Sequence, residues 1–522
     1  MNNCPFDINP YAQSSSFKTT NFSNINYTNQ DFWSLKSRLV SLIQERFGVN
    51  GTVLPNTFND LVESSVAIML MENWAFIGDT LSFKMDQQFN EIFMTTVTQL
   101  DNAFRIARGY GFKPTPPIAA VSYWTATLNA PVVTDITIAT PLSIPLPSPT
   151  IFNTSIELFP ADSNNQPIFN QDIIIPAGQT INQTIIGVEG KTINQEAAGS
   201  GTVGQSVSLS SYPVLLDSIQ VLVDGNTWSE VDYFTDSQPR QEYRVEFNAL
   251  YQAFIIFGNN RAGMLPSPGS RISITYRVGG GPAGNIVTGA IEYQKQAFVP
   301  GLKFSVPISF RNYTAGQYGY GGDGLEDIRR KLPQWIQTQQ RMVSPNDFKT
   351  LCEQFATPYN GQIRKATAVL RNYGCSGNIV DIYVLSNNSG VLQIASDGLK
   401  SNLSDYVATN KMINCYVCIR DGFILNTDVL IDLTLDRIDR KFEAEISDQV
   451  NRLIAIFFNI NNWDFGDILK DVDIIKTLSS IKQIKSFSIS FVTQSGETGN
   501  SVVPKFFEIV QPDNINVSFI YE

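Results

Sequence analysis

Residues 253 to 285 read AFIIFGNNRAGMLPSPGSRISITYRVGGGPAGN, and this stretch carries most of the fold information in the sequence. It holds two short segments rich in β-branched and aromatic residues, Ala253–Phe257 and Arg271–Val278, which predict strands. Gly258-Asn259-Asn260 predicts a hairpin turn, because Gly and Asn tolerate positive φ. The glycines at 258, 263, 269, 281 and 284 stand where β segments turn, so we interpret them as backbone positions and not as ligand sites.

The hydrophobic pattern changes on both sides of this stretch. Apolar residues recur at helical spacing up to about residue 113, at spacing two to about residue 320, and in mixed patterns from Asp323 onward. A chain of 522 residues has room for about three to four domains. We predict a multidomain α+β protein with an N-terminal helical region, central antiparallel β domains and C-terminal α+β domains. The predicted segments are an extended arm (1–30), a helical bundle region (31–113), a β-rich domain (114–210), a β domain with the 253–285 motif (211–322), an α+β domain (323–425) and a C-terminal α+β domain (426–522).

Three helices are predicted in the N-terminal region. The first starts near Phe32 and ends at Gly48; the second starts at a Thr57 cap and runs to about Gly78; the third covers about 82–109. Their apolar faces are too broad for so small a segment to bury alone. We therefore predict that these helices bind a partner outside the region.

Capping signals and alternation place elements elsewhere. Asp323 with Glu326 predicts a capping box, and Ser344 with Pro345 and Asp347 predicts another helix start. Alternation predicts strands such as Val121–Leu128, and a stripe of apolar residues near 446–457 predicts a core-facing helix. The loop 459–467, with Trp463 expected to be exposed, is a candidate pairing surface. The stripe residues are Ile446, Val450, Leu453, Ile454 and Phe457.

The composition excludes several classes of function. The chain has no His, so Ser-His-Asp and Cys-His catalysis and His-ligated metals are absent. Charged residues are only 16% and the net charge is −11, which does not favour nucleic acid or anionic lipid as a partner. We expect no signal peptide and no membrane-spanning segment, since neither a basic start nor a long apolar run occurs.

Cysteines and short motifs also argue against a catalytic, cofactor or metal site. Five cysteines are too few for a disulfide scaffold, and Cys415 and Cys418 fall on opposite faces of a predicted strand, so we expect buried free thiols. Gly279, Gly281 and Gly284 spell a GxGxxG pattern, but no acidic residue follows at the spacing that a ribose needs. We therefore predict no catalytic, cofactor or metal site, and a protein that is not an enzyme.

The motif and its downstream block resemble the baseplate J-like wedge proteins of contractile phage tails and related injection systems. The resemblance runs from about residue 30 to the end and is most specific over 253–348. The chain departs from the family pattern at Asn259-Asn260, where many relatives have Asp-Gly, and at Ile484-Lys485-Ser486, where relatives often have Gly-Val. The residues that carry the resemblance are Phe257, Gly258, Gly263, Pro266, Gly269, Tyr276, Gly281, Gly284, Asn285, Gly322, Asp323, Glu326 and Asp347.

The resemblance implies a structural subunit of the virion, located in the tail baseplate and assembled in the host cytoplasm. It implies dimers within and between wedges, with the C-terminal domain (426–522) pairing neighbouring wedges into a ring. The other implied partners are a smaller helical wedge protein, a lysozyme-like sheath-initiator subunit and the tail hub. The ring would widen when sheath contraction is triggered. Two alternatives stay open at this point: a β-rich tail adhesin that binds polysaccharide, with Trp124 and Trp228 as the only tryptophans of the β region, and a glycosidase that uses two carboxylates.

Overall fold

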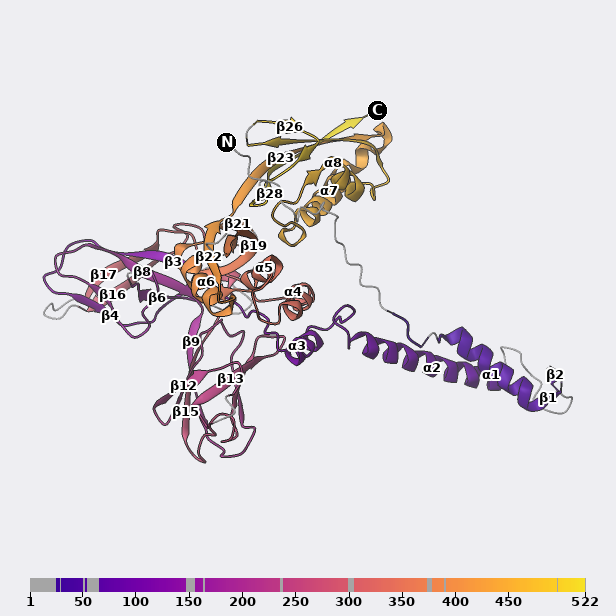
Figure 1. The fold of residues 1–522 in the computed structure, drawn as a ribbon, viewed down its shortest axis with the longest axis horizontal. Coiled ribbons are helices and arrows are strands. Elements are labelled where there is room, and N and C mark those ends of the chain that lie inside the picture. The colour runs from indigo at the N-terminus through magenta and orange to yellow at the C-terminus, as the bar shows by residue number, and fades with distance from the viewer. Residues whose placement is uncertain are drawn as a thin grey trace. The chain divides into compact units, whose positions relative to one another are not determined.

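The computed structural model describes residues 25–521 with gaps at 29, 50–51, 54–64, 147–154, 163–164, 235–237, 299–304, 373–377, 389–390 and 495. Its helices and sheets make a multidomain α+β chain (Figure 1). The described residues form two compact units: one ends at Lys113 and also includes Gly324–Arg329, and the other comprises Pro114–Asp323 and the chain from Arg330 onward. Residues 1–24 of the predicted arm and the predicted cap at Thr57 lie outside the described residues.

The N-terminal unit is built on two long helices that pack against each other, α1 and α2. Helix α1 begins at Phe32 and ends before Gly48, as predicted. The predicted break at Gly78 is wrong, because α2 continues through it. A Cβ at Gly78 would lie 2.9 Å from Leu35 Cδ1, so this glycine admits α1 instead of ending the helix. The elements are α1 (Phe32–Phe47), β1 (Gly48–Val49), β2 (Thr52–Val53), α2 (Val66–Asn90) and α3 (Leu100–Gly109).

The predicted third helix over 82–109 is also wrong, because the chain leaves the helical path between α2 and α3. There the Glu91 carboxylate accepts hydrogen bonds from the backbone N of Thr98 at 2.9 Å and of Gln99 at 3.1 Å. These bonds fix the turn before α3 and satisfy backbone donors at its start. Periodicity alone carries no signal for such a turn, since the residues that flank it remain apolar.

The first β domain is a six-stranded antiparallel sheet built from two separate parts of the chain. Strands β16 and β17 lie at 292–312, and they join the sheet formed by residues 121–189, whereas the sequence pattern groups them with the second β domain. Its core includes Trp124 and Phe310, both fully buried. In order across the sheet the strands are β16 (Glu292–Phe298), β17 (Ser305–Asn312), β3 (Val121–Leu128), β8 (Ile181–Glu189), β6 (Ser155–Pro160) and β5 (Leu142–Pro145), with the pair β4 (Ile136–Ile138) and β7 (Ile173–Ile175) beside it.

The second β domain is a seven-stranded sheet in which only β12 and β13 run parallel. The turn at Asp224-Gly225 joins β11 and β12. The predicted hairpin at Gly258-Asn259-Asn260 is wrong, because β14 and β15 are not neighbours and the chain between them crosses from one side of β11–β13 to the other. In order the strands are β10 (Ser206–Ser208), β14 (Ala253–Phe257), β13 (Glu242–Phe247), β12 (Asn226–Glu230), β11 (Gln220–Val223), β15 (Arg271–Val278) and β9 (Lys191–Ala198).

The middle α+β domain packs helices α5 and α6 on one face of a five-stranded sheet. Ser344 caps α5 with Pro345 next to it, and Asp347 closes the capping box, as predicted. Strand β22 runs parallel to β20. The elements are α4 (Leu325–Thr338), α5 (Pro345–Glu353), β18 (Ala356–Thr357), β19 (Gly361–Asn372), β20 (Asn378–Asn388), β21 (Val391–Ile394), α6 (Asp397–Asn410) and β22 (Cys415–Asp421).

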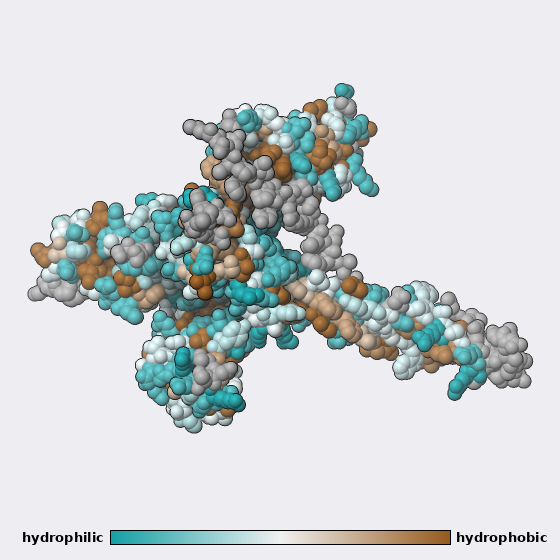
Figure 2. Space-filling view, in the orientation of Figure 1, coloured by the Kyte–Doolittle hydropathy of each residue, from teal (hydrophilic) through white to brown (hydrophobic). Residues whose placement is uncertain are grey.

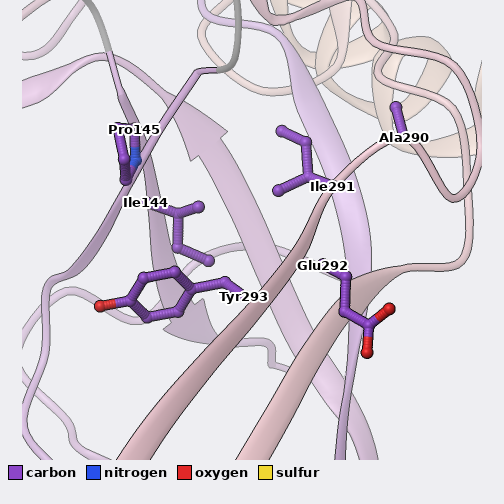
Figure 3. A pocket seen from close by; sticks show the side chains of 6 residues that line it. All are labelled: Ile144, Pro145, Ala290, Ile291, Glu292 and Tyr293. Atoms are coloured by element: carbon purple, nitrogen blue, oxygen red, sulfur yellow. The ribbon is translucent and has the colours of Figure 1, made fainter.

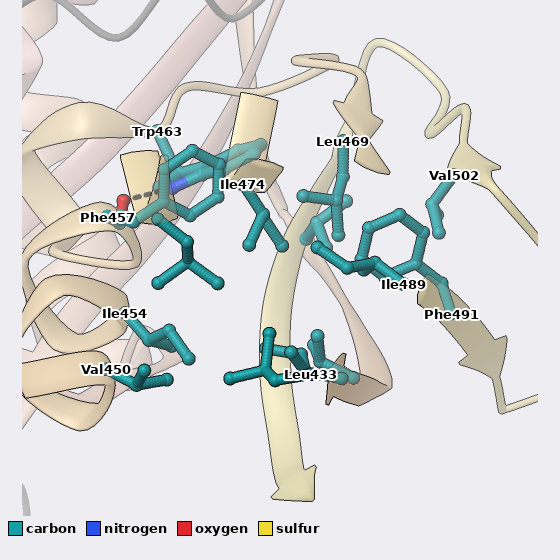
Figure 4. Packing of buried hydrophobic residues seen from close by; sticks show 14 of the residues in the cluster. Leu433, Val450, Ile454, Phe457, Trp463, Leu469, Ile474, Ile489, Phe491 and Val502 are labelled. Carbon is teal, nitrogen blue, oxygen red and sulfur yellow. Dashed lines mark hydrogen bonds between the residues drawn. The ribbon is translucent and has the colours of Figure 1, made fainter. Parts of the chain in front are cut away.

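The C-terminal domain packs helices α7 and α8 against a sheet ordered β26-β25-β23-β28 (Figure 4). The predicted stripe on α7 is core: Ile446, Val450, Ile454 and Phe457 are buried, and Leu453 packs against them. The elements are β23 (Phe423–Leu435), α7 (Glu443–Phe457), β24 (Leu469–Lys470), α8 (Asp471–Leu478), β25 (Ile484–Thr493), β26 (Thr498–Gly499), β27 (Ser501–Val502) and β28 (Glu508–Tyr521).

The loop 459–467 lies in the C-terminal domain and contacts the middle domain, and Trp463 in it is not exposed. Trp463 is buried among the helices of the C-terminal domain, and its Nε1 donates to the Phe457 carbonyl oxygen at 2.9 Å (Figure 4). The next residue, Asp464, accepts from Lys349 Nζ at 2.9 Å and from Lys365 Nζ at 2.8 Å, both in the middle domain. The loop therefore serves a contact within the chain, and the prediction that Trp463 is exposed is wrong.

Candidate functional site: a glycine-rich joint and an exposed apolar helix

The motif residues in strands β14 and β15 point into the core of the second β domain. Phe257 is 2% exposed and meets Trp228 edge to face, with ring centroids 5.5 Å apart. The ring of Tyr276 is fully buried, and its hydroxyl accepts from the backbone N of Ser211 at 3.2 Å. Both residues therefore hold the sheet together and are closed to a ligand.

Arg277, the residue after Tyr276, ties the second β domain to the first. Its Nη1 lies 2.6 Å from Glu157 Oε2 on β6, and both side chains are almost fully buried. Its Nη2 donates to the carbonyl oxygens of Val188 and Glu189, each at 3.2 Å. A buried ion pair needs such additional hydrogen bonds to offset the desolvation of the charges. This joint was not predicted; its signs in the sequence are one acid in strand β6, Glu157, and one buried arginine in strand β15, Arg277.

The glycine loop that follows binds a carboxylate of the chain itself. Glu189 is fully buried, and its two carboxylate oxygens accept from the backbone N of Gly280 at 2.8 Å and of Gly281 at 3.1 Å. A Cβ at Gly284 would lie 2.5 Å from the Cβ of Glu189. The loop amides that could hold a phosphate are therefore already occupied, which agrees with the interpretation of the GxGxxG pattern as a turn.

The five motif glycines serve two different backbone purposes. Gly263, Gly269 and Gly281 have φ of +70°, +79° and +67°, the region that favours glycine. Gly258 and Gly284 do not, and there the prediction of positive φ is wrong. A Cβ at Gly258 would lie 2.3 Å from the carbonyl carbon of Gly263, so close approach of the backbone demands glycine at that position.

Three further motif residues make contacts within the chain. Asn285 exchanges hydrogen bonds with the backbone of Gly319, donating to its oxygen at 3.1 Å and accepting from its nitrogen at 3.0 Å. Gly322, with φ of +89°, packs against the ring of Tyr251. Pro266 is buried in the β14–β15 connection. These contacts join the motif to other parts of the same chain.

Asp323 does not cap helix α4, so the predicted capping box is wrong. Its buried carboxylate instead accepts from Lys331 Nζ at 2.6 Å, Tyr320 Oη at 2.8 Å and the backbone N of Thr115 at 2.9 Å. Burial opposes ionisation, but Lys331 and these donors hold the pKa of Asp323 below its ordinary value. Glu326 stays exposed and pairs with Arg329 at 2.5 Å.

Helix α2 carries an exposed apolar surface, the second candidate feature. Trp74 and Phe83 are 68% and 69% exposed, and hydrophobic side chains line this helical hairpin (Figure 2). Trp74 and Phe76 are two residues apart, which places them about 200° apart around a helix. Exposed apolar residues fill the arc between them, so the surface is much wider than a single stripe. The exposed apolar residues of α2 are Val66, Met69, Leu70, Trp74, Phe76, Ile77, Leu81, Phe83, Met85 and Phe89.

A cavity of about 250 Å³ lies between β5 and β16, the two edge strands of the six-stranded sheet (Figure 3). Its lining is largely apolar, and its one carboxylate, Glu292, accepts from Ser309 Oγ at 3.0 Å. Glycoside cleavage by acid and base needs two carboxylates, so this cavity does not supply that chemistry. The lining residues are Ile144, Pro145, Ala290, Ile291, Glu292 and Tyr293.

The tryptophans and cysteines named from the sequence can also be placed in the structure. Trp124 and Trp228, the two tryptophans of the β region, are 0% and 5% exposed and face protein cores. Cys352 and Cys415 are buried thiols, but Cys418 is exposed, so the prediction of buried thiols is wrong for Cys418.

Over the described ranges, no three His, Cys, Asp or Glu side chains gather to hold a metal ion. No helix in the described part of the chain is long and apolar enough to cross a membrane.

Comparison with known proteins gives similarity in structure and none in sequence. No family model matches the chain, and no curated protein matches its sequence. Among solved structures, the chain is similar to the cryo-EM structure of the anti-feeding prophage baseplate, six-fold symmetrised. The similarity covers 91% of this chain and 90% of the other, at 10% sequence identity and a TM-score of 0.35. A similarity of this size does not assign a function to the chain.

Proposed function

We propose that the protein is a structural wedge subunit in the baseplate of a contractile phage tail or a related injection system, and that it is not an enzyme. The observation that carries the proposal is the exposed apolar arc of α2. A helix that is apolar around most of its circumference is stable only when other elements bury it. Helix α1 covers one side, and the exposed side requires a partner in the assembly.

The width of the arc favours a helical bundle as the mode of assembly. One packed helix covers a narrow stripe, whereas side chains about 200° apart require helices from two directions. A second copy of this chain together with a smaller helical wedge protein would supply them. The few charges along the arc, such as Lys84 between Phe83 and Met85, agree with a permanent interface more than with a transient one.

The glycine motif fits a mechanical role. Its residues form a buried joint around Arg277 and Glu189, with the loop amides satisfied by the chain. The same residues carry the sequence resemblance to the wedge proteins, so the part shared with that family is a rigid connection between domains. A subunit of this kind would transmit movement when the ring around the hub widens and sheath contraction begins.

Imaging of particles tests the proposal. An antibody against this chain, detected with gold on purified tail particles, is expected to mark a ring at the tail end below the sheath. Label along fibres would favour the adhesin instead, and purified particles that carry no label would contradict the proposal. An antibody against a sheath protein on the same particles controls for access.

A further inference from the structure

Strand β22 forms an edge of the middle sheet. Within the described part of the chain it pairs only with β20, so its other edge presents backbone groups without strand partners. Tyr416 is 66% exposed, and Cys418 and Arg420 are exposed on the same face of the sheet. An exposed edge strand is a template for pairing with another strand.

The sequence of this edge is self-complementary. When two copies of Cys415–Asp421 are placed antiparallel with Cys418 opposite Cys418, Tyr416 of each copy lies opposite Arg420 of the other. Val417 then lies opposite Ile419, which gives apolar pairs on the opposite face. No like charges meet in this register, and like charges directly opposite each other would weaken an antiparallel pair.

The charges around the edge support this register. Arg420 Nε lies 3.0 Å from Oδ1 of Asp381, a carboxylate that is 1% exposed and also pairs with Arg371. Asp381 therefore fixes the guanidinium of Arg420 at the surface, and a fixed guanidinium is well placed to stack on an aromatic ring. Tyr416 of a second copy is that ring in the antiparallel register.

Two large apolar side chains lie beyond the ends of β22. Ile413, in the turn before the strand, is 99% exposed, and Phe423, the first residue of β23, is 50% exposed. They flank the paired segment and take no part in its register, which covers Cys415–Asp421.

We propose that β22 is an interaction surface for a second copy of this chain, with the two strands antiparallel and Cys418 on the two-fold axis. A seven-residue strand pair buries less area than a standard protein interface, so the isolated pair is weak, with a dissociation constant on the order of micromolar. The pairing stands on the edge strand alone and does not require the baseplate function.

Cross-linking through Cys418 tests the position of the axis. The full chain with Cys4→Ser and Cys375→Ser retains the buried Cys352 and Cys415 and the exposed Cys418. Oxygen with copper–phenanthroline is expected to join two Cys418 thiols as a disulfide, since directly opposite residues in an antiparallel pair lie within disulfide range. The control adds Cys418→Ser and Ser488→Cys, which moves the thiol to an exposed residue on β25. Equal yields of dimer from both proteins would overturn the proposal.

Charge variants at one position test the register. Tyr416→Lys places a cation opposite Arg420 of the second copy, whereas Tyr416→Glu places an anion there. By sedimentation equilibrium of the full chain, the Lys variant is expected to dimerise about tenfold more weakly than the Glu variant, because the contact occurs twice per dimer. Equal dissociation constants for the two variants, or a wild-type chain that stays monomeric at high micromolar concentration, would contradict the pairing. Either result would leave the baseplate proposal intact.

Discussion

Arg277 on β15 and Glu157 on β6 form a buried ion pair between two β domains, with Nη1 and Oε2 2.6 Å apart. Arg271 lies on the same strand and pairs with Glu196, but both of those side chains are exposed. One strand thus carries a buried and an exposed version of the same pair, which allows a matched comparison.

Arg277→Met is expected to lower the free energy of unfolding by about 3–5 kcal/mol, because Glu157 would remain buried without its counter-ion. Arg271→Met is expected to leave the stability unchanged, because water screens that exposed pair. Urea unfolding of the two variants and the wild type measures the difference. A small effect of Arg277→Met would show that water reaches Glu157.

A second comparison concerns two glycines with similar φ. A Cβ at Gly281 would lie 2.1 Å from the Tyr320 carbonyl oxygen, while a Cβ at Gly269 would meet no atom within 4 Å. Gly269→Ala is expected to cost about 1 kcal/mol from backbone strain alone. Gly281→Ala adds a clash with backbone and is expected to cost several times more, or to yield insoluble protein. Thermal unfolding of both variants provides the measurement, and equal midpoints would contradict the assignment of the clash.

The loop 459–467, which contacts the middle domain through Asp464, predicts a dependence of stability on pH. Burial, together with the neighbouring Asp464 carboxylate, raises the pKa of Asp467 to about 6. An unfolded Asp titrates near pH 4, so between about pH 4 and 6 the folded chain binds the extra proton. The contribution of Asp467 to stability is therefore expected to fall as the pH rises through this window.

Asp467→Asn removes this titration and keeps an oxygen that can accept the hydrogen bond from the Asp464 backbone N, now 2.8 Å long. The variant is expected to gain on the order of 1 kcal/mol at pH 7 and nothing at pH 4. Asp464→Asn is the opposing control. Although burial would raise the pKa of Asp464, Lys365 and Lys349 hold it below its ordinary value, so this variant is expected to lose stability above pH 4. Chemical unfolding at pH 4 and 7 separates the two outcomes.

The exposed face of α2 gives a prediction about association. The full chain with Trp74→Gln and Phe83→Gln is expected to associate less and to bind less hydrophobic dye, without a change in the unfolding midpoint, because both side chains lie in water. Ile68→Gln is the control, since Ile68 is 2% exposed and its change should unfold the helical hairpin. Sedimentation velocity and circular dichroism distinguish these results. Association that survives both exposed substitutions would place the partner surface elsewhere.

Local signals predicted elements well, and long-range partners poorly. Val121–Leu128 and the Ser344 cap are found where the pattern placed them, because alternation and capping depend on neighbouring residues. The predictions for Gly78 and Asp323 are wrong because contacts distant from the local pattern decide their roles. Gly78 makes room for Leu35 of α1, and Asp323 pairs with Lys331. No spacing rule connects either pair. The crossing of the chain between β14 and β15 likewise depends on pairing with distant strands. The exposed surface of α2 was predictable in kind, since its apolar residues exceed one helical face.

The second β domain enters and leaves the first at adjacent points. Strand β9 begins directly after Gly190, and its first residue, Lys191, pairs with Val278, the last residue of β15. The two ends of the inserted segment are therefore neighbours. The host sheet then resumes with β16 and β17. A segment whose ends are close can change in length or be exchanged without altering the register of its host. In descent, such a protein could therefore acquire new surfaces by replacing this insertion, provided that an arginine at its exit still reaches Glu157.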